Sequence, residues 1–287
     1  MTDFLEQVVR ERRAYVAAAR ASRSLDEVTR AAKRAAIGRG TLSFAKALRD
    51  RRRDGRLAVI AEVKRTSPAL GHLSEIDDPA RLAQRYQAGG AAAISVLVEP
   101  RHWGGSLDDI RRVEPAVRRS TFDGGGDARI LPIPVLAKDV VVDEYQIAEA
   151  GAAGAHAVLL IAEIFETAEL ARLAGFAHEL GMDALVEAHE RDAFVRALRS
   201  GAPAVGVNAR DLRHPAHLDR TRIHELAGEL VTDQVLVAES GITSVQDARA
   251  LPPRVDAILV GTALVTSADP AALVRALADV RPAKVLA

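Results

Sequence analysis

Polar side chains stand at the ends of several apolar segments, where buried strands would be expected to finish. Lys138 follows "PVLA", and Glu62 and Lys64 end the segment "LAVIAEVK". Because side chains alternate along a strand, Glu62 and Lys64 would share one face. Other members of this set are Glu187, Asn208, Glu239 and Ser240. If these groups face one cavity, they could move protons onto and off a substrate and stabilise charge that develops on it.

A second chemical feature is the glycine that follows each of the last two apolar segments. "AESGI" places Ser240 before Gly241, and "VGTAL" places Gly261 before Thr262. Barrel folds often bind phosphate after their last two strands, where glycine lets the anion approach backbone N–H groups. The alternative is an ordinary glycine turn. The paired placement favours a phosphate site.

These residues require a fold that brings distant strand ends together. From Leu57 onward, short segments rich in Val, Ile, Leu and Ala alternate with amphipathic helical patterns such as residues 78–90 and 167–181. The predicted strands are residues 57–63, 92–97, 134–138, 157–161, 184–188, 204–208, 235–239 and 257–261. Near-continuous apolar segments are typical of parallel strands covered on both faces. The pattern predicts an α/β fold, a (β/α)8 TIM barrel, in which chemistry occurs at the carboxyl ends of the strands.

The whole chain, residues 1–287, is predicted to be one domain: a barrel over residues 57–280 and an N-terminal helical extension over residues 1–50 that lies across it. A doubly wound sheet is the alternative, but "AEVKRTSPALG" lacks the Gly-x-Gly-x-x-Gly turn of its dinucleotide-binding form. The arginine-rich segment 49–54 is predicted to be a solvated helix face. The segment 118–133 contains Gly-Gly-Gly and is predicted to be a flexible insertion rather than a phosphate cradle.

Composition argues against several function classes. Lys plus Arg and Asp plus Glu number 39 each, so no net charge attracts nucleic acid or an anionic membrane. The absence of cysteine excludes disulfides and a cysteine nucleophile and fits a cytoplasmic protein. We find neither a secretory signal nor the apolar stretch of about 20 residues that crosses a bilayer. His214 and His217 flank Pro215 with no third ligand nearby in the sequence, which predicts a loop rather than a metal site.

Six segments, in order, carry a resemblance to a known family. They are "AEVKRTSPALG" (61–71), "SVLVEPRHWGGSLDDI" (95–110), "LAKDVVVDEYQIAEA" (136–150), "ALVEAH" (184–189), "GVNARDL" (206–212) and "AESGI" (238–242). In these segments the chain resembles indole-3-glycerol phosphate synthase, across the whole barrel and the N-terminal helices. The resemblance implies decarboxylating ring closure and dehydration of 1-(2-carboxyphenylamino)-1-deoxyribulose 5-phosphate in tryptophan biosynthesis. It implies no cofactor and no metal.

The resemblance also implies roles for individual residues. Lys138 would be the general acid that protonates the substrate carbonyl, and Lys64 would hold the substrate carboxylate. Glu62 and Glu187 would serve the dehydration as acid or base. The residues implied to order hydroxyls or to line the phosphate are Asn208, Arg210, Glu239, Ser67, Ser240, Gly241, Gly261 and Thr262. For Lys138 to act as an acid at neutral pH, we expect burial and a second ammonium to lower its pKa.

Departures from the family pattern surround Lys138. Ala137 stands where arginine is usual, and Val140 stands where an aromatic residue is usual, which predicts a thinner apolar wall against the substrate ring. Asp139 is predicted to start the following helix or to orient its neighbours. Two alternatives stay open: a phosphoribosyl aldose–ketose isomerase, and a barrel that binds a phosphorylated ligand without catalysis. The expected partner in each case is a small phosphorylated molecule, and the expected state is a monomer or weak homo-oligomer.

Overall fold

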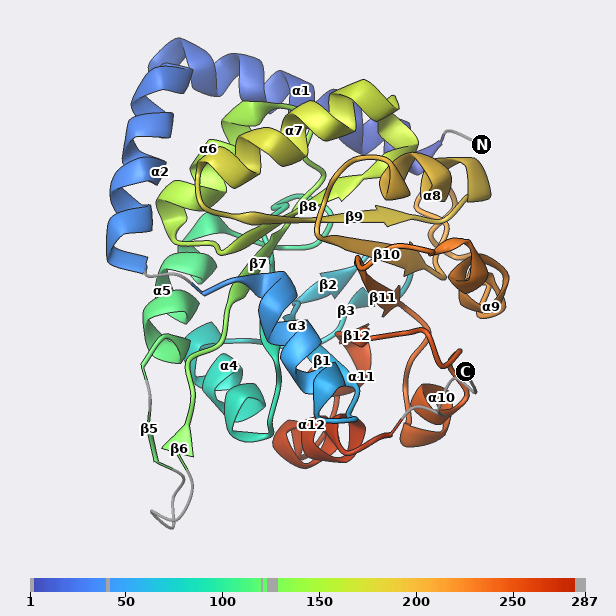
Figure 1. Cartoon of the computed structure of the whole chain (residues 1–287). Helices are drawn as coiled ribbons and strands as arrows, with labels where there is room; N and C mark the ends of the chain where they lie inside the picture. The colour runs from blue at the N-terminus through green and yellow to red at the C-terminus, as the bar shows by residue number, and fades with distance from the viewer. Residues whose placement is uncertain (1–2, 40–41, 120, 123–128, 282–287) are drawn as a thin grey trace.

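The computed structural model describes residues 3–39, 42–119, 121–122 and 129–281, and the part of the chain that it describes is built around a closed parallel barrel (Figure 1). The barrel strands are β1 (Ala58–Val63), β4 (Ala93–Leu97), β7 (Val135–Lys138), β8 (Ala157–Ile161), β9 (Asp183–Ala188), β10 (Ala204–Asn208), β11 (Val235–Glu239) and β12 (Ala257–Val260). They pair in chain order, and β12 closes on β1. The predicted barrel is therefore confirmed, and each predicted strand agrees to within one residue at either end.

Helices cover the outside of the barrel, and three of those that the structure describes precede its first strand in the chain. The α-helices are α1 (Phe4–Ser22), α2 (Leu25–Arg39), α3 (Phe44–Arg53), α4 (Pro79–Ala88), α5 (Leu107–Val117), α6 (Glu144–Ala153), α7 (Thr167–Glu179), α8 (Arg191–Leu198), α9 (Arg222–Leu226), α10 (Val245–Arg249), α11 (Thr262–Val265) and α12 (Pro270–Ala278). Short 3₁₀ helices lie at Ala162–Ile164 and Ala227–Glu229. None of the helices within the described ranges is long and apolar enough to cross a membrane.

Alternation along the strands separates the barrel interior from the layer beneath the helices. On β1, Ala58 and Ile60 belong to the interior cluster, whereas Val59 and Ala61 belong to the outer cluster. The same period places Glu62 on the interior face above Ile60, where it is 2% exposed. The interior thus changes from apolar layers near the amino ends to a charged layer at the carboxyl ends.

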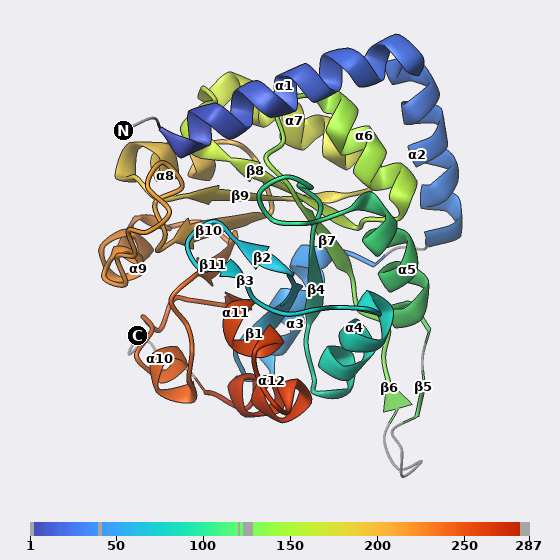
Figure 2. The same ribbon diagram turned by 180° about the vertical axis from the view of Figure 1, so that it is seen from behind.

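Helix α3 closes the amino end of the barrel. Ser43 caps it, and both the Ser43 hydroxyl and the Ala45 N–H donate to the carboxylate of Asp183, the first residue of β9. Phe44 and Leu48 are fully buried in the interior cluster. The sequence pattern predicts a solvated face for the arginine-rich segment at the end of this helix, residues 49–54. It does not predict that the apolar side of the helix enters the barrel. Figure 1 looks onto α3, and Figure 2 looks from behind onto the short strands β2 (Thr66–Ser67) and β3 (Gly71–His72) at the other end.

Helices α1 and α2 form the predicted N-terminal extension, and both pack on the barrel's own helices. Helix α2 lies along α6, and α1 also contacts α6 while running across the top of the molecule in Figure 2. Arg12 of α1 forms a buried ion pair with Asp139, the residue after β7, with 2.5 Å between Nη2 and Oδ2. The Asp139 carboxylate also accepts hydrogen bonds from Gln146 and from the Val140 N–H. The extension is thereby joined to the strand end that carries Lys138.

The segment 118–133 contains a pair of short antiparallel strands. β5 (Thr121–Phe122) pairs with β6 (Arg129–Ile130), and both lie at the edge of the molecule beside α5 in Figure 1. The glycine tract that suggested a flexible insertion, residues 124–126, lies outside the described residues.

Replacing Arg12 should destabilise the protein more than an ordinary surface change. Arg12→Ala leaves the Asp139 carboxylate buried without its cation, and breaking such a pair costs about 3–5 kcal/mol. The free energy of unfolding, measured by urea denaturation, should fall by about that amount. Arg13→Ala, at the exposed next position of the same helix, should change it by about 0.5 kcal/mol or less. Equal effects of the two variants would contradict a stabilising role for the ion pair.

Candidate active site

A cavity of about 320 Å³ opens at the carboxyl ends of the barrel strands. Its walls include every residue that the sequence predicted for the site: Glu62, Lys64, Ser67, Lys138, Glu187, Asn208, Arg210, Glu239, Ser240, Gly241, Gly261 and Thr262. These residues come from strands or loops spread around the whole barrel. The fold therefore brings the predicted set together in one place.

Lys138 lies between two carboxylates that reach into the barrel interior from other strands. Its Nζ donates to Glu187 Oε2 at 3.0 Å and to Glu239 Oε2 at 2.8 Å. Lys138 ends β7, whereas Glu187 and Glu239 stand on β9 and β11. The two glutamate side chains are almost wholly buried, and the lysine side chain is 16% exposed. The ammonium group can therefore be reached from the cavity.

The electrostatic environment of Lys138 differs from the one that the sequence predicted. Burial lowers the pKa of Lys138, but the nearby carboxylates of Glu187, Glu239 and Glu62 outweigh burial and raise the pKa above its usual value. The expectation of a lowered pKa is therefore wrong. That expectation counted burial and the second ammonium, Lys64, without the three carboxylates that surround Lys138.

Burial also raises the pKa of Glu239. Lys138 opposes this shift, and the neighbouring carboxylate of Glu187 adds to it. The second oxygen, Oε1, is buried and has no hydrogen-bond partner in the described part of the chain, which further disfavours the ionised form. Protonation of Glu239 and the charge on Lys138 are thus coupled through the 2.8 Å contact between them.

Glu62 and Lys64 form the second ion pair of the cavity. Lys64 Nζ lies 2.9 Å from Glu62 Oε2, so the predicted sharing of one face is confirmed. Gly261 makes this pair possible, because a Cβ at that position would lie 2.1 Å from Glu62 Oε2. Gly206 on β10 likewise leaves room for Glu239, which binds Lys138, because a Cβ at position 206 would lie 2.2 Å from Glu239 Oε1. Gly206 was not predicted, and the only signal in the sequence is a glycine inside the strand segment "AVGVN".

Asn208 connects the charged cluster to the glycine turn after β11. Its side-chain N–H donates to Glu187 Oε2 at 3.3 Å, and its Oδ1 accepts from Ser240 Oγ at 2.8 Å and from the Arg210 N–H at 3.0 Å. Ser240 has φ 65°, a left-handed conformation that costs a non-glycine residue about 1–3 kcal/mol, and Gly241 follows with φ 76°. The bond to Asn208 helps to hold this unusual turn at the cavity wall.

The other predicted binding residues surround the same opening. Ser67 lies in β2 and is 5% exposed, and Thr262 begins α11 directly after Gly261. The Arg210 guanidinium donates to the carbonyl oxygen of Pro215 within its own loop, and burial lowers its pKa.

Sequence reasoning expected an apolar wall that includes Val140 but missed three other apolar residues that line the cavity. They are Trp103, Leu70 and Leu212. Glu99 accepts hydrogen bonds from the backbone N–H groups of residues 101–103, which fixes the loop that carries Trp103. Phe4 of α1 packs against the Trp103 ring with 5.8 Å between centroids. The signal that could have found this residue is that Trp103 is the single tryptophan of the chain.

The residues around Lys138 divide between the cavity and the outer layer. Val140 lines the cavity, as the prediction of a thinner wall requires, whereas Ala137 belongs to the outer cluster beneath the helices. Asp139 does not start α6; Asp143 caps that helix by accepting the Tyr145 N–H. The change at Ala137 therefore lies away from any ligand in the cavity.

Comparison with known proteins decides the family. The family model of indole-3-glycerol phosphate synthase matches residues 5–277. This chain belongs to the indole-3-glycerol phosphate synthase family. It is 44% identical over 267 residues to the indole-3-glycerol phosphate synthase of Mycolicibacterium smegmatis, covering 93% of this chain and 90% of that protein. It is 48% identical over 224 residues to the same-named protein of a Nocardioides species, covering 78% of this chain and 80% of that protein.

Solved structures with lower identity support the fold alone. A tryptophan synthase chain from M. tuberculosis aligns with a TM-score of 0.54 at 17% identity, over 82% of this chain and 98% of that chain. A thiamine phosphate pyrophosphorylase from Pyrococcus furiosus aligns with a TM-score of 0.53 at 15% identity, over 77% of this chain and 93% of that chain.

Adding a methyl group at Gly206 should destabilise the protein, because the new Cβ would overlap the buried Glu239 carboxylate. We expect Gly206→Ala to lower the free energy of unfolding by about 1–3 kcal/mol, the usual cost of overpacking. Gly175→Ala is the matched control, since Gly175 lies in α7 with no atom near its missing Cβ. That change should stabilise the helix by about 0.5–1 kcal/mol. Urea denaturation of both variants checks the prediction, which would be wrong if Gly206→Ala were as stable as the parent.

Proposed function

We propose that this cavity carries out the reaction for which the family is named, the formation of indole-3-glycerol phosphate from 1-(2-carboxyphenylamino)-1-deoxyribulose 5-phosphate. The reaction needs a proton donor for the substrate carbonyl, a cation for the substrate carboxylate and groups that move protons during dehydration. The observation that carries the proposal is the position of Lys138 between Glu187 and Glu239, facing the same cavity as the Glu62–Lys64 pair.

In the first step, Lys138 acts as general acid. The surrounding carboxylates keep it protonated, so an ammonium group is available whenever the substrate binds. As the substrate carbonyl oxygen gains negative charge, it becomes a better proton acceptor, and transfer from Lys138 completes the new hydroxyl. Carbon–carbon bond formation disrupts the aromatic ring, and loss of carbon dioxide restores it.

In the second step, the hydroxyl leaves as water and the pyrrole ring of the indole is completed. Glu187 and Glu62 are the candidates for moving the protons of this step. Glu187 already binds the Lys138 ammonium, so a proton can pass between the two groups over 3.0 Å. Glu62 is placed in the same way beside Lys64, at 2.9 Å.

Substrate binding is proposed to divide between two walls of the cavity. Lys64 attracts the carboxylate of the substrate ring, and Trp103 and Val140 provide apolar surface for that ring. The phosphate is assigned to the backbone around Gly241 and Gly261, with Ser67, Ser240 and Thr262 as hydroxyl donors and Arg210 nearby. Asn208 and Glu239 order the hydroxyl groups between these ends.

The proposed partner is this one small phosphorylated substrate, and nucleic acid and membrane surfaces are not expected to bind. We further propose that the protein works in the cytoplasm as a monomer or weak homo-oligomer. The neutral overall charge supports the absence of nucleic-acid and membrane binding, and the lack of cysteine fits a reducing compartment.

Replacing Lys138 should abolish most of the activity. In Lys138→Met the general acid is lost while most of the side-chain volume remains, so kcat should fall by about 100-fold to 10,000-fold. Formation of the indole ring can be followed by its fluorescence. Lys46→Met is the matched control, because Lys46 is an exposed lysine of α3, and it should keep the parental rate. No product from the folded parent protein would contradict the proposed function, and full turnover by Lys138→Met would contradict the role of this lysine.

The pH dependence of the reaction should report the carboxylates around Lys138. Glu239 raises the pKa of Lys138, so Glu239→Gln removes that contribution and should lower it. Lys138 is active as its protonated form, and loss of the proton at high pH ends activity. The alkaline limb of the profile of kcat/KM against pH should therefore move to lower pH in Glu239→Gln. An alkaline limb at the same or higher pH than in the parent would show that Lys138 does not set it.

A further inference from the structure

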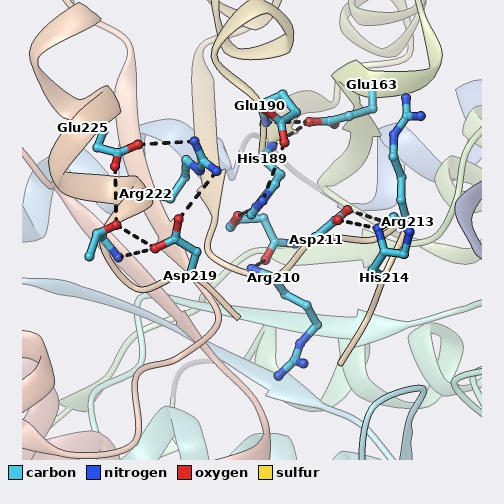
Figure 3. Close-up of polar contacts among 12 residues, drawn as sticks. Glu163, His189, Glu190, Arg210, Asp211, Arg213, His214, Asp219, Arg222 and Glu225 are labelled. Atoms are coloured by element: carbon cyan, nitrogen blue, oxygen red, sulfur yellow. Dashed lines mark hydrogen bonds and ion pairs between the residues drawn. The ribbon is translucent and has the colours of Figure 1, made fainter. Parts of the chain in front are cut away.

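A group of potential metal ligands lies beside the active-site cavity, at the carboxyl ends of β9 and β10. His189 directly follows β9, and Asp211 and His217 belong to the loop after β10; Figure 3 shows His189 and Asp211 with their partners. One ligand atom from each residue lies within 4.8 Å of those of the other two. These side chains are separate from the residues that line the active-site cavity.

His189 is buried and oriented as a metal ligand requires. It is 5% exposed, and its Nδ1 lies 2.8 Å from the carbonyl oxygen of Asn208. A carbonyl can only accept, so Nδ1 carries the proton and Nε2 keeps its lone pair. A hydrogen bond of this kind fixes the tautomer and ring orientation of metal-bound histidines. Among the described residues no hydrogen bond engages Nε2, and Glu190 Oε1 lies 3.9 Å from it.

Backbone hydrogen bonds hold the two loop ligands close together. The Asp211 N–H donates to the carbonyl oxygen of His217 at 3.2 Å, and the His217 N–H donates to that of His214 at 2.7 Å. The Asp211 carboxylate accepts from the Arg213 N–H at 2.8 Å and lies 2.9 Å from His214 Nδ1, as Figure 3 shows. Asp211 is thereby oriented by its own loop, while its distance to His189 depends on the barrel.

We propose that His189, Asp211 and His217 bind a divalent transition-metal ion, with Zn²⁺ as the best match. Two imidazoles and one carboxylate form a ligand set that suits zinc, with water in the fourth position. Zinc–ligand distances of about 2.0–2.1 Å place tetrahedral ligands about 3.3 Å apart, so the three atoms need to approach by roughly 1.5 Å or less. The exposed side chain of His217 can supply this movement.

The tertiary structure changes how the sequence "HPAH" is understood. In the sequence alone, His214 and His217 have no third ligand nearby, which predicts a loop pair. The fold places His189 and Asp211 beside His217, and it makes His214 a partner of Asp211 rather than a member of the ligand group.

Metal binding would tie the loop after β10 to the end of β9. The same loop contributes Arg210 and Leu212 to the active-site cavity, and β9 carries Glu187. An ion would therefore fix one wall of that cavity. This consequence for substrate binding rests on the proposed function, whereas binding of the ion does not.

The protein is first stripped of metal with a chelator and then titrated with Zn²⁺ in competition with a chromophoric chelator, which gives the affinity and the number of ions bound. The visible absorption spectrum of the Co²⁺ form reports the coordination geometry. The parent should bind one ion per chain. Loss of an outer-shell partner weakens metal binding by about 10–100-fold, so loss of a ligand in His217→Ala or Asp211→Asn should weaken it at least as much. His178→Ala, at an exposed histidine of α7, should leave it unchanged.

Three results would overturn the proposal: no stoichiometric binding to the parent, undiminished binding to His217→Ala, or a larger loss in His214→Ala than in His217→Ala. Thermal melting of each metal-free variant identifies any that fail to fold. If Asp211→Asn does not fold, the comparison rests on His217→Ala, because His217 is exposed. Because the titration does not measure turnover, a negative result stays distinguishable from failure of the proposed function.

Discussion

The ammonium of Lys138 lies between the carboxylates of Glu187 and Glu239, at 3.0 and 2.8 Å, and only 16% of the lysine side chain is exposed. Taking a single such ion out of water costs several kcal/mol, and breaking a buried pair costs about 3–5 kcal/mol. The carboxylates would likewise repel one another without the lysine. Each charge is therefore tolerated only because the others are held at hydrogen-bonding distance, and the site depends on a backbone that keeps those distances.

Several features of the barrel keep these charged groups at hydrogen-bonding distance. Parallel pairing places Gly206 beside Glu187 on β9 and Asn208 beside Glu239 on β11, so one strand contributes both space and a hydrogen-bonding amide. Helix α3 fills the opposite end of the barrel with apolar side chains, which leaves the charged layer open toward one side only. At the edge of this layer, the Arg12–Asp139 ion pair joins the N-terminal helix to the residue after Lys138. A scaffold of this kind keeps the lysine charged.

Patterns along the chain were enough to predict the strands and the residues at their ends. The apolar segment that ends in Lys138 is a strand because a parallel strand covered on both faces has to be apolar along its whole length. Other features left no local pattern. The clash that excludes a side chain at Gly206 involves Glu239, and the partner of Asp139 lies on α1, so both depend on contacts between distant segments. Trp103 is a similar case, since its ring packs against Phe4 of α1, far away in the sequence.

The sequence by itself determined the barrel, the family and the polar side chains at the strand ends that face the cavity, because periodicity and motifs can be read along the chain without knowing which segments touch. Only the tertiary structure decided the charge state of Lys138, whose pKa rises with the number and distance of the carboxylates around it. It also decided that Asp139 binds Arg12 and that His189 and Asp211 approach His217. Electrostatic energy and metal coordination depend on distances in space, and these distances are set when strands far apart in the chain close into one barrel.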